Sequence, residues 1–151
     1  MPIITTEDFV LRYAVSIAFQ DDGAKLEECI ERYENYYLNQ LFGADLLASY
    51  NGTIPNDYLE PFTIDYCNTI IESKGIKDML LCLIWWHYCY DTPTVPTSIG
   101  NSVPDIEAGT LSIDYNIFNQ GVKTFKNIQY RLEKDGVSLF NGQLLRYKSW
   151  L

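Results

Sequence analysis

Few residues of this sequence could support catalysis or bind a metal ion. His87 is the only histidine, and no motif places a serine, cysteine or carboxylate beside it, as a nucleophile or a general base would require. The four cysteines include no CxxC pair, which leaves poor material for a zinc site. We therefore expect a packed histidine, buried free thiols at Cys29, Cys67, Cys82 and Cys89, no enzymatic activity, and neither a metal nor a cofactor.

The histidine lies in the most apolar stretch of the chain, Ile76–Tyr90, in which Met79–Trp86 contains no charge. A helix formed here would be hydrophobic on every side, so other elements must cover it all round. It is too short to cross a bilayer and is closely flanked by charged residues, so we expect no membrane association. The core of the protein should therefore centre on Leu80, Leu81, Ile84 and Trp85.

The chain has 151 residues, which predicts one domain spanning 1–151. Its net charge of −9 argues against specific nucleic-acid binding, which draws on clustered lysine and arginine. The charge is unevenly distributed: 1–110 holds 17 acidic and 5 basic residues, whereas 111–151 holds 3 and 6. An acidic body with a basic end could pair head to tail with copies of itself, or could simply be solvated. Nothing at the amino terminus indicates secretion.

Hydrophobic periodicity and capping residues predict a mainly α-helical bundle of four to five helices. The segment 57–73 is accepted as a helix only if Pro61 falls in its first turn, and it should pack antiparallel to the central helix. Gly121 predicts close approach of another backbone. The expected helices are 6–19, 22–42, 57–73, 76–91 and 112–134.

The segment 92–111 interrupts the helical pattern with prolines, glycines and threonines. A loop of this length in a small domain is usually functional or disordered. It also carries spaced apolar residues, which a solvated loop would not need. We expect an extended arm, or a loose β-hairpin, that lies on a neighbouring subunit through Val95, Ile99, Val103 and Ile106.

The last segment, 137–151, is more apolar and aromatic than a free terminus should be. It either closes its own bundle or docks on a partner. Docking is favoured, because buried aromatic and leucine anchors dominate many interfaces and the basic residues suit an acidic partner surface. The predicted docking residues are Leu139, Phe140, Leu144, Leu145, Arg146, Tyr147, Lys148, Trp150 and Leu151.

Several motifs, taken in order along nearly the whole chain, resemble the helical head-to-tail connector family of tailed bacteriophages, which includes adaptor and head-completion proteins. The motifs are Leu41-Phe42-Gly43 followed by Asp45-Leu46-Leu47, then Trp85-Trp86-His87-Tyr88, the threonine-rich loop 97–103, Tyr115-Asn116, and the apolar tail. Each is unspecific alone, and their order, the chain length and the lack of an enzyme motif carry the resemblance.

The resemblance implies a small helical bundle that assembles as a ring of identical copies under the portal, commonly twelve-fold. Its loops and termini would contact the portal, a neighbour, or tail and other neck proteins. The protein would be made in the host cytoplasm and reside at the neck of the virion. Two other readings remain open: a different neck or tail-completion ring, and a monomeric helical protein-binding module.

Overall fold

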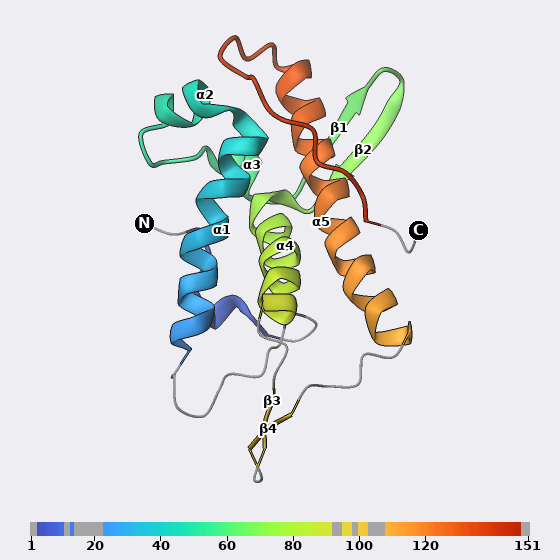
Figure 1. Ribbon diagram of the computed structural model, residues 1–151. Helices are drawn as coiled ribbons and strands as arrows, with labels where there is room; N and C mark the ends of the chain where they lie inside the picture. The colour runs from blue at the N-terminus through green and yellow to red at the C-terminus, as the bar shows by residue number, and fades with distance from the viewer. Residues whose placement is uncertain are drawn as a thin grey trace.

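The computed structural model describes residues 3–10, 13, 23–91, 95–97, 100–102 and 108–148, with side chains described outside 90–114. The described part is mainly α-helical, as predicted (Figure 1). Its elements are a 3-10 helix η1 (Thr6–Asp8), α1 (Ala24–Phe42), α2 (Ala44–Ser49), α3 (Asn56–Leu59), β1 (Phe62–Tyr66), β2 (Thr69–Ser73), α4 (Gly75–Asp91), β3 (Val95–Thr97), β4 (Gly100–Ser102) and α5 (Ala108–Lys134).

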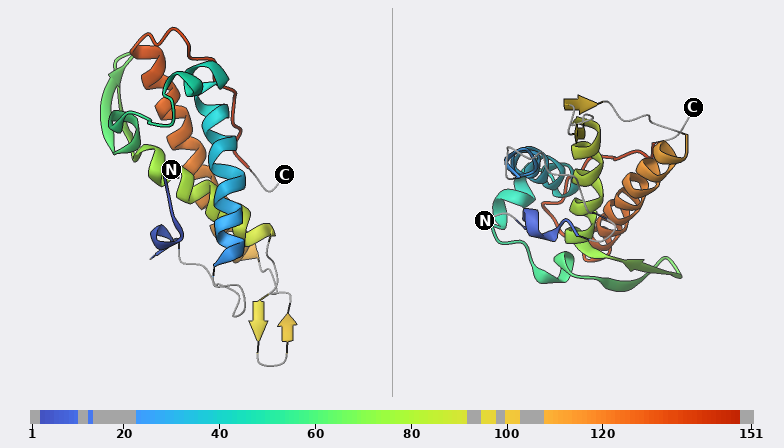
Figure 2. Two further views of the ribbon diagram at one scale, coloured as in Figure 1. Left: turned by 90° about the vertical axis from the view of Figure 1, so that its left-hand side faces the viewer. Right: turned by 90° about the horizontal axis from the view of Figure 1, so that it is seen from below.

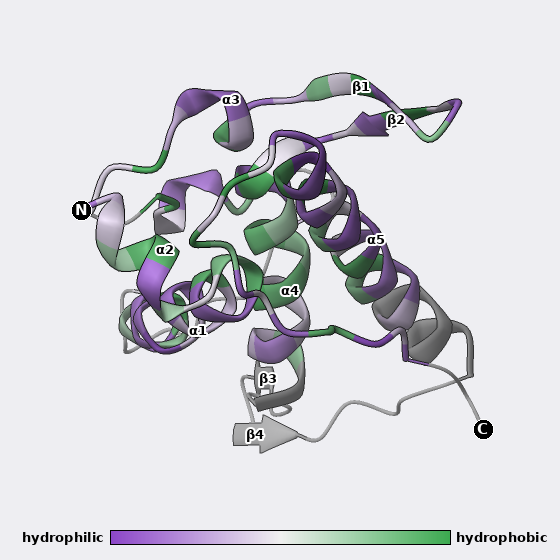
Figure 3. Ribbon diagram, turned by 90° about the horizontal axis from the view of Figure 1, so that it is seen from above, coloured by the Kyte–Doolittle hydropathy of each residue, from purple (hydrophilic) through white to green (hydrophobic). Residues whose placement is uncertain are grey.

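Helix α4 is the central helix, as its composition predicts. It packs against both α1 and α5, and Figure 3 shows it as a hydrophobic helix between two helices that are hydrophilic on the outside. Leu80 and Ile84 are fully buried and Trp85 nearly so, whereas Leu81 is half-buried at the edge of the core.

Gly121 allows α5 to approach α4 closely, because a Cβ atom there would lie 2.9 Å from side-chain atoms of Cys82 and Leu83. The predicted neighbour was another backbone, whereas the nearest atoms are side-chain atoms of α4, so the close approach is one of a helix to side chains. The packing of α5 against α4 is therefore explained by the hydrophobic composition of α4 and by the missing side chain at Gly121.

The predicted helix 57–73 is wrong. Helix α3 ends at Leu59, and Glu60 is extended, with φ −95° and ψ 162°. Pro61 explains the break, because a proline disfavours helical conformation in the residue that precedes it. The chain then forms the antiparallel hairpin β1–β2, so the segment 57–73 supplies no long helix beside α4.

The β1–β2 hairpin turns at Cys67 and Asn68, which have positive φ of 52° and 63° and lie between the paired residues Tyr66 and Thr69. Two central residues of positive φ are the mark of the type I′ hairpin turn, whose twist matches that of the strands. The overlooked sequence signal is a concentration of β-branched residues that favour strands, namely Thr63, Ile64, Thr69, Ile70 and Ile71.

Three further boundaries differ from the prediction. The expected helix 6–19 is interrupted, since η1 ends at Asp8 and Phe9 and Val10 are not helical. Its remaining positions other than Tyr13 lie outside the described residues. Helix α1 begins at Ala24 after Gly23, and α5 begins at Ala108, before the predicted start at 112.

The arm predicted for 92–111 contains a β-hairpin, β3–β4, in which Val95 pairs with Ser102. Figures 1 and 2 show this hairpin projecting from the end of the bundle where α4 finishes. Ile99, Val103 and Ile106 lie outside the described residues, and their contact with a neighbouring subunit stays a prediction.

Candidate functional site

The segment 137–148, here called the C-terminal strap, follows the end of α5 and runs back over the outside of the bundle (Figure 1). It contains no helix or strand, so its position depends on hydrogen bonds and side-chain contacts. Gly136 adopts a positive φ of 66° and lies between α5 and this returning chain. Such a glycine is a common helix terminator.

The strap completes the hydrogen bonding of the carboxyl end of α1. The last four carbonyls of a helix have no partner within it. Here Gln40 O accepts from Gln143 N (2.6 Å) and Phe42 O accepts from Asn141 N (3.1 Å). Gln129 of α5 donates to Leu41 O (3.3 Å) and also to Gln143 O (2.9 Å). The strap therefore joins α1 to α5.

The far end of the strap is attached to α5 by a two-bond pairing. Asn119 Nδ2 donates to Lys148 O, and Lys148 N donates to Asn119 Oδ1, both at 2.8 Å. The Lys148 ammonium lies 4.5 Å from the ring centroid of Trp86 and 5.0 Å from that of Phe118. A cation over an aromatic face is attracted by the ring quadrupole, so these contacts add to the pairing.

The structure divides the predicted docking residues into an inner and an outer set. Phe140 and Leu145 are half-buried against the core of their own chain. The backbone and inner side chains of the tail therefore pack on its own bundle, and docking on a partner stays a prediction. Trp150 and Leu151 lie outside the described residues.

The outer set forms an apolar and basic surface. Leu144 is 68% exposed, Tyr147 51% and Leu139 47%, which are high values for large hydrophobic side chains. Arg146 is also exposed, and the Lys126 ammonium of α5 lies 4.4 Å from the ring centroid of Tyr147. We call Leu139, Leu144, Arg146, Tyr147 and Lys126 the outer strap face.

The cations of the outer strap face are not neutralised within the described part of the chain. The ion pairs found there are Arg32–Glu28, Lys77–Glu60 and Arg131–Asp135, and none of them involves Lys126, Arg146 or Lys148. The surface thus combines exposed apolar side chains with positive charge, on a chain whose net charge is −9. Such a combination suits an acidic protein partner.

Three α5 residues of this site were not predicted from the sequence. Asn119, Lys126 and Gln129 lie seven and three residues apart, which places them along one side of a helix. They are polar residues next to the predicted apolar face, and such positions usually face solvent. The sequence alone does not show that the strap covers this side of α5, so it does not show what these three residues contact.

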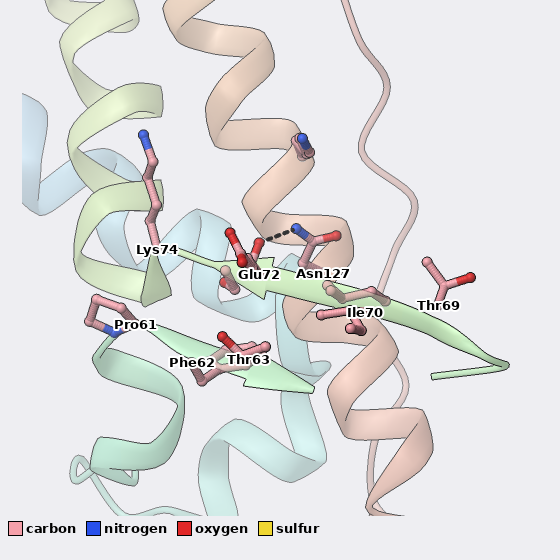
Figure 4. A pocket seen from close by; sticks show the side chains of 11 residues that line it. Pro61, Phe62, Thr63, Thr69, Ile70, Glu72, Lys74 and Asn127 are labelled. Carbon is pink, nitrogen blue, oxygen red and sulfur yellow. Dashed lines mark hydrogen bonds between the residues drawn. The ribbon is translucent and has the colours of Figure 1, made fainter. Parts of the chain in front are cut away.

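The hairpin β1–β2 borders a hollow of roughly 1110 Å³ against α5. Figure 4 shows side chains of both strands around it, with Asn127 donating to the backbone oxygen of Glu72 at 3.2 Å. Its charged lining residues are Glu72, Lys74 and Lys123, and their arrangement matches no catalytic or metal-binding set. Ile70 is 71% exposed beside it.

The titratable side chains of the core, His87 and Tyr13, make stacking and hydrogen-bond contacts within the bundle. His87 is stacked on Tyr33 with ring centroids 3.8 Å apart and is hydrogen-bonded to Tyr37, so the expected packed histidine is confirmed. Tyr13 donates to Asp78 Oδ1 at 2.7 Å, and its burial, with Cys82 and Asp78 beside it, raises the pKa of its phenol.

The prediction for the thiols holds in part. All four are free, with Cys29 and Cys82 buried and Cys89 half-buried, but Cys67 is exposed at the hairpin turn. No helix within the described residues has the length and hydrophobicity needed to span a membrane.

Comparisons of the chain with protein-family models, with curated proteins and with solved structures found no significant match.

Proposed function

We propose that this protein is a structural component of a tailed-bacteriophage virion, a head-to-tail connector that forms a ring of identical copies between portal and tail. The observation that carries the proposal is the outer strap face, where Leu144 and Tyr147 are more than half exposed beside unneutralised cations. A surface of this kind is costly to leave in water and is typical of an interface.

The distribution of charge supports assembly from copies of one chain. The basic outer strap face belongs to the segment 111–151, whereas 1–110 carries a net charge of −12. Two different surfaces that attract each other on identical molecules give a heterologous contact, and such contacts close into a ring when the rotation between copies permits it. The order of motifs that resembles the connector family agrees with this arrangement.

The projecting β3–β4 hairpin supports the same proposal. It extends from the bundle at the end of α4 (Figure 2), where it could lie on a neighbouring copy or on another neck protein. Extended arms of this kind enlarge an interface without enlarging the domain. The same features would serve a different neck or tail-completion ring, so the location in the virion needs a direct test.

The proposal is tested by deleting the gene from the phage genome that encodes the chain. We expect DNA-containing heads and free tails that do not join, with joining restored by the wild-type gene but not by Leu144→Glu. Gold-labelled antibody should then mark the neck of complemented virions. Normal tailed particles in the absence of the protein would contradict the proposal, and label at the tail tip would contradict the neck assignment.

A further inference from the structure

A small hollow between the N-terminal segment and α1 carries charge opposite to that of the outer strap face. It has a volume of about 190 Å³ and is lined by Ile4, Thr5, Thr6, Glu27, Ile30 and Glu31. Ile4 and Ile30 are 1% and 4% exposed, so the floor is apolar. Glu27 and Glu31 are exposed, so carboxylates form the rim. We call it the N-terminal hollow.

The hollow depends on how the N-terminal segment is held against α1. Glu34 accepts hydrogen bonds from the backbone N–H groups of Ile3 at 2.8 Å and Ile4 at 3.0 Å. These bonds hold the segment beside Ile30, one turn earlier on the same helix. The hollow is thus built from two segments whose relative position is specified.

The hollow is suited to one aliphatic or aromatic side chain. A cavity of about 150 Å³ lined by apolar residues accommodates a benzene molecule. A volume of about 190 Å³ therefore suits a leucine side chain or a phenol ring. Carboxylates at its rim would attract a basic residue next to that side chain. Leu144 and Tyr147, with Arg146 and Lys126 beside them, present this combination.

The two surfaces cannot satisfy each other within one molecule. In the side view of Figure 2, the N-terminal segment and the strap lie on opposite sides of α1. Contact between them therefore requires a second copy. Each copy would offer its outer strap face to one neighbour and its N-terminal hollow to the other, which is the heterologous arrangement that a ring requires.

We propose that the N-terminal hollow receives the outer strap face of an adjacent copy, with Leu144 or Tyr147 resting on the floor formed by Ile4 and Ile30, and Arg146 facing Glu27 and Glu31. This proposal rests on the proposed ring and names the two surfaces that form it. The neighbour's carboxylates would neutralise charges that are unpaired in the described part of a single chain.

A charge exchange tests the proposed pairing. Arg146→Glu and Glu31→Lys should each weaken self-association by about tenfold or more, because each places like charges in contact. The double variant should restore association, as should a mixture of the two single variants. Matched controls are Lys134→Glu and Asp65→Lys, which change net charge equally at exposed sites elsewhere and should leave association unchanged.

Weak association is captured by zero-length carbodiimide coupling in a mixture of ¹⁵N-labelled and unlabelled wild-type chains. We expect links of mixed isotope between Lys126 and Glu27 or Glu31. If the wild-type chain associates but both single variants associate equally well, or the double variant is not rescued, the pairing is wrong while the ring proposal stands. A wild-type chain without association and without mixed-isotope links would overturn both.

Discussion

The backbone of Asn141 lies so close to Gly43 that no side chain fits between them. A Cβ atom on Gly43 would lie 2.5 Å from Asn141 O, and Gly43 itself has φ 84° and ψ 155°, a conformation almost restricted to glycine. Gly43 therefore ends α1 and also gives the strap room to reach the carbonyl of Phe42.

Gly43→Ala should destabilise the protein by more than backbone strain alone, which costs about 1–3 kcal/mol at such positions. The matched control is Gly52→Ala, because Gly52 has a nearly equal φ of 83° but open space where the Cβ would lie. Chemical denaturation of both variants measures the difference. Equal losses of unfolding free energy would show that the strap does not pack on α1.

Neighbouring leucines of the strap should respond differently to truncation. Leu145→Ala should lower the free energy of unfolding by about 1–3 kcal/mol, since Leu145 packs against the core. Leu144→Ala should change it by less than about 0.5 kcal/mol, because this side chain is 68% exposed.

The comparison of these leucines is made by thermal melting at a concentration where the chain is monomeric, since assembly itself adds stability. The effects on self-association should have the reverse order, with Leu144→Ala weakening it more than Leu145→Ala does. A larger loss of monomer stability for Leu144→Ala would place it in the core and remove the outer strap face.

Asn119→Ala should release the end of the strap while leaving the bundle folded. Two backbone hydrogen bonds to Lys148 are lost, and each contributes about 0.5–1.5 kcal/mol net, so local opening should rise roughly tenfold. Limited trypsin digestion after Arg146 measures this opening. Asn127→Ala, which affects the β1–β2 hairpin instead, is the control and should leave the cleavage rate unchanged. Similar rates in both variants would contradict the assigned pairing.

Stability should depend on pH through Glu34. Burial raises the pKa of its carboxyl above 4.5, and the bonds from Ile4 and Ile3 oppose this only in part. The folded state then binds a proton more readily than the unfolded state, so this group's contribution to stability falls as pH rises from about 4.5 through the raised pKa. The amide in Glu34→Gln can accept a hydrogen bond without a charge, and it does not titrate.

The stability of Glu34→Gln relative to wild type should therefore increase as pH rises through this window. Melting curves of both proteins from pH 4.5 to 7.5 measure the difference in their stability. The other acidic groups are the same in both proteins, so their contributions to the pH dependence cancel in this difference. A variant that becomes progressively less stable than wild type over the same range would mean that the ionised carboxylate is favoured by its bonds to the N-terminal segment.

The elements that the sequence predicts well are those set by local pattern. The uncharged stretch Met79–Trp86 specifies a helix that must be surrounded, and Gly43 marks the end of α1. The hairpin β1–β2 was missed because aromatic and aliphatic residues spaced by four, Phe62, Tyr66 and Ile70, also fit a helical face. Strands form instead, because Pro61 disfavours a helix at the preceding residue and the β-branched residues favour strands.

The site could be predicted only in part, because composition cannot say which side of a segment faces inward. The apolar excess of the tail pointed to Leu139, Leu144 and Tyr147, which are indeed exposed. Its attachment to the bundle depends on Asn119 and Gln129, whose partners are backbone atoms distant in the sequence. Such contacts leave no local periodic signal.

The central claim is that copies of this chain assemble through the outer strap face, and the native mass of the assembled particle tests it most directly. Wild-type protein and Leu144→Glu are measured by light scattering over a range of concentrations, and again after release from portal-bearing heads to which the chain has been added and from which the excess has been removed. We predict a closed multiple of 17.4 kDa for the wild type, and monomers of unchanged melting temperature for the variant. A wild-type mass of 17.4 kDa under every condition, or a variant that assembles like wild type, would contradict the account.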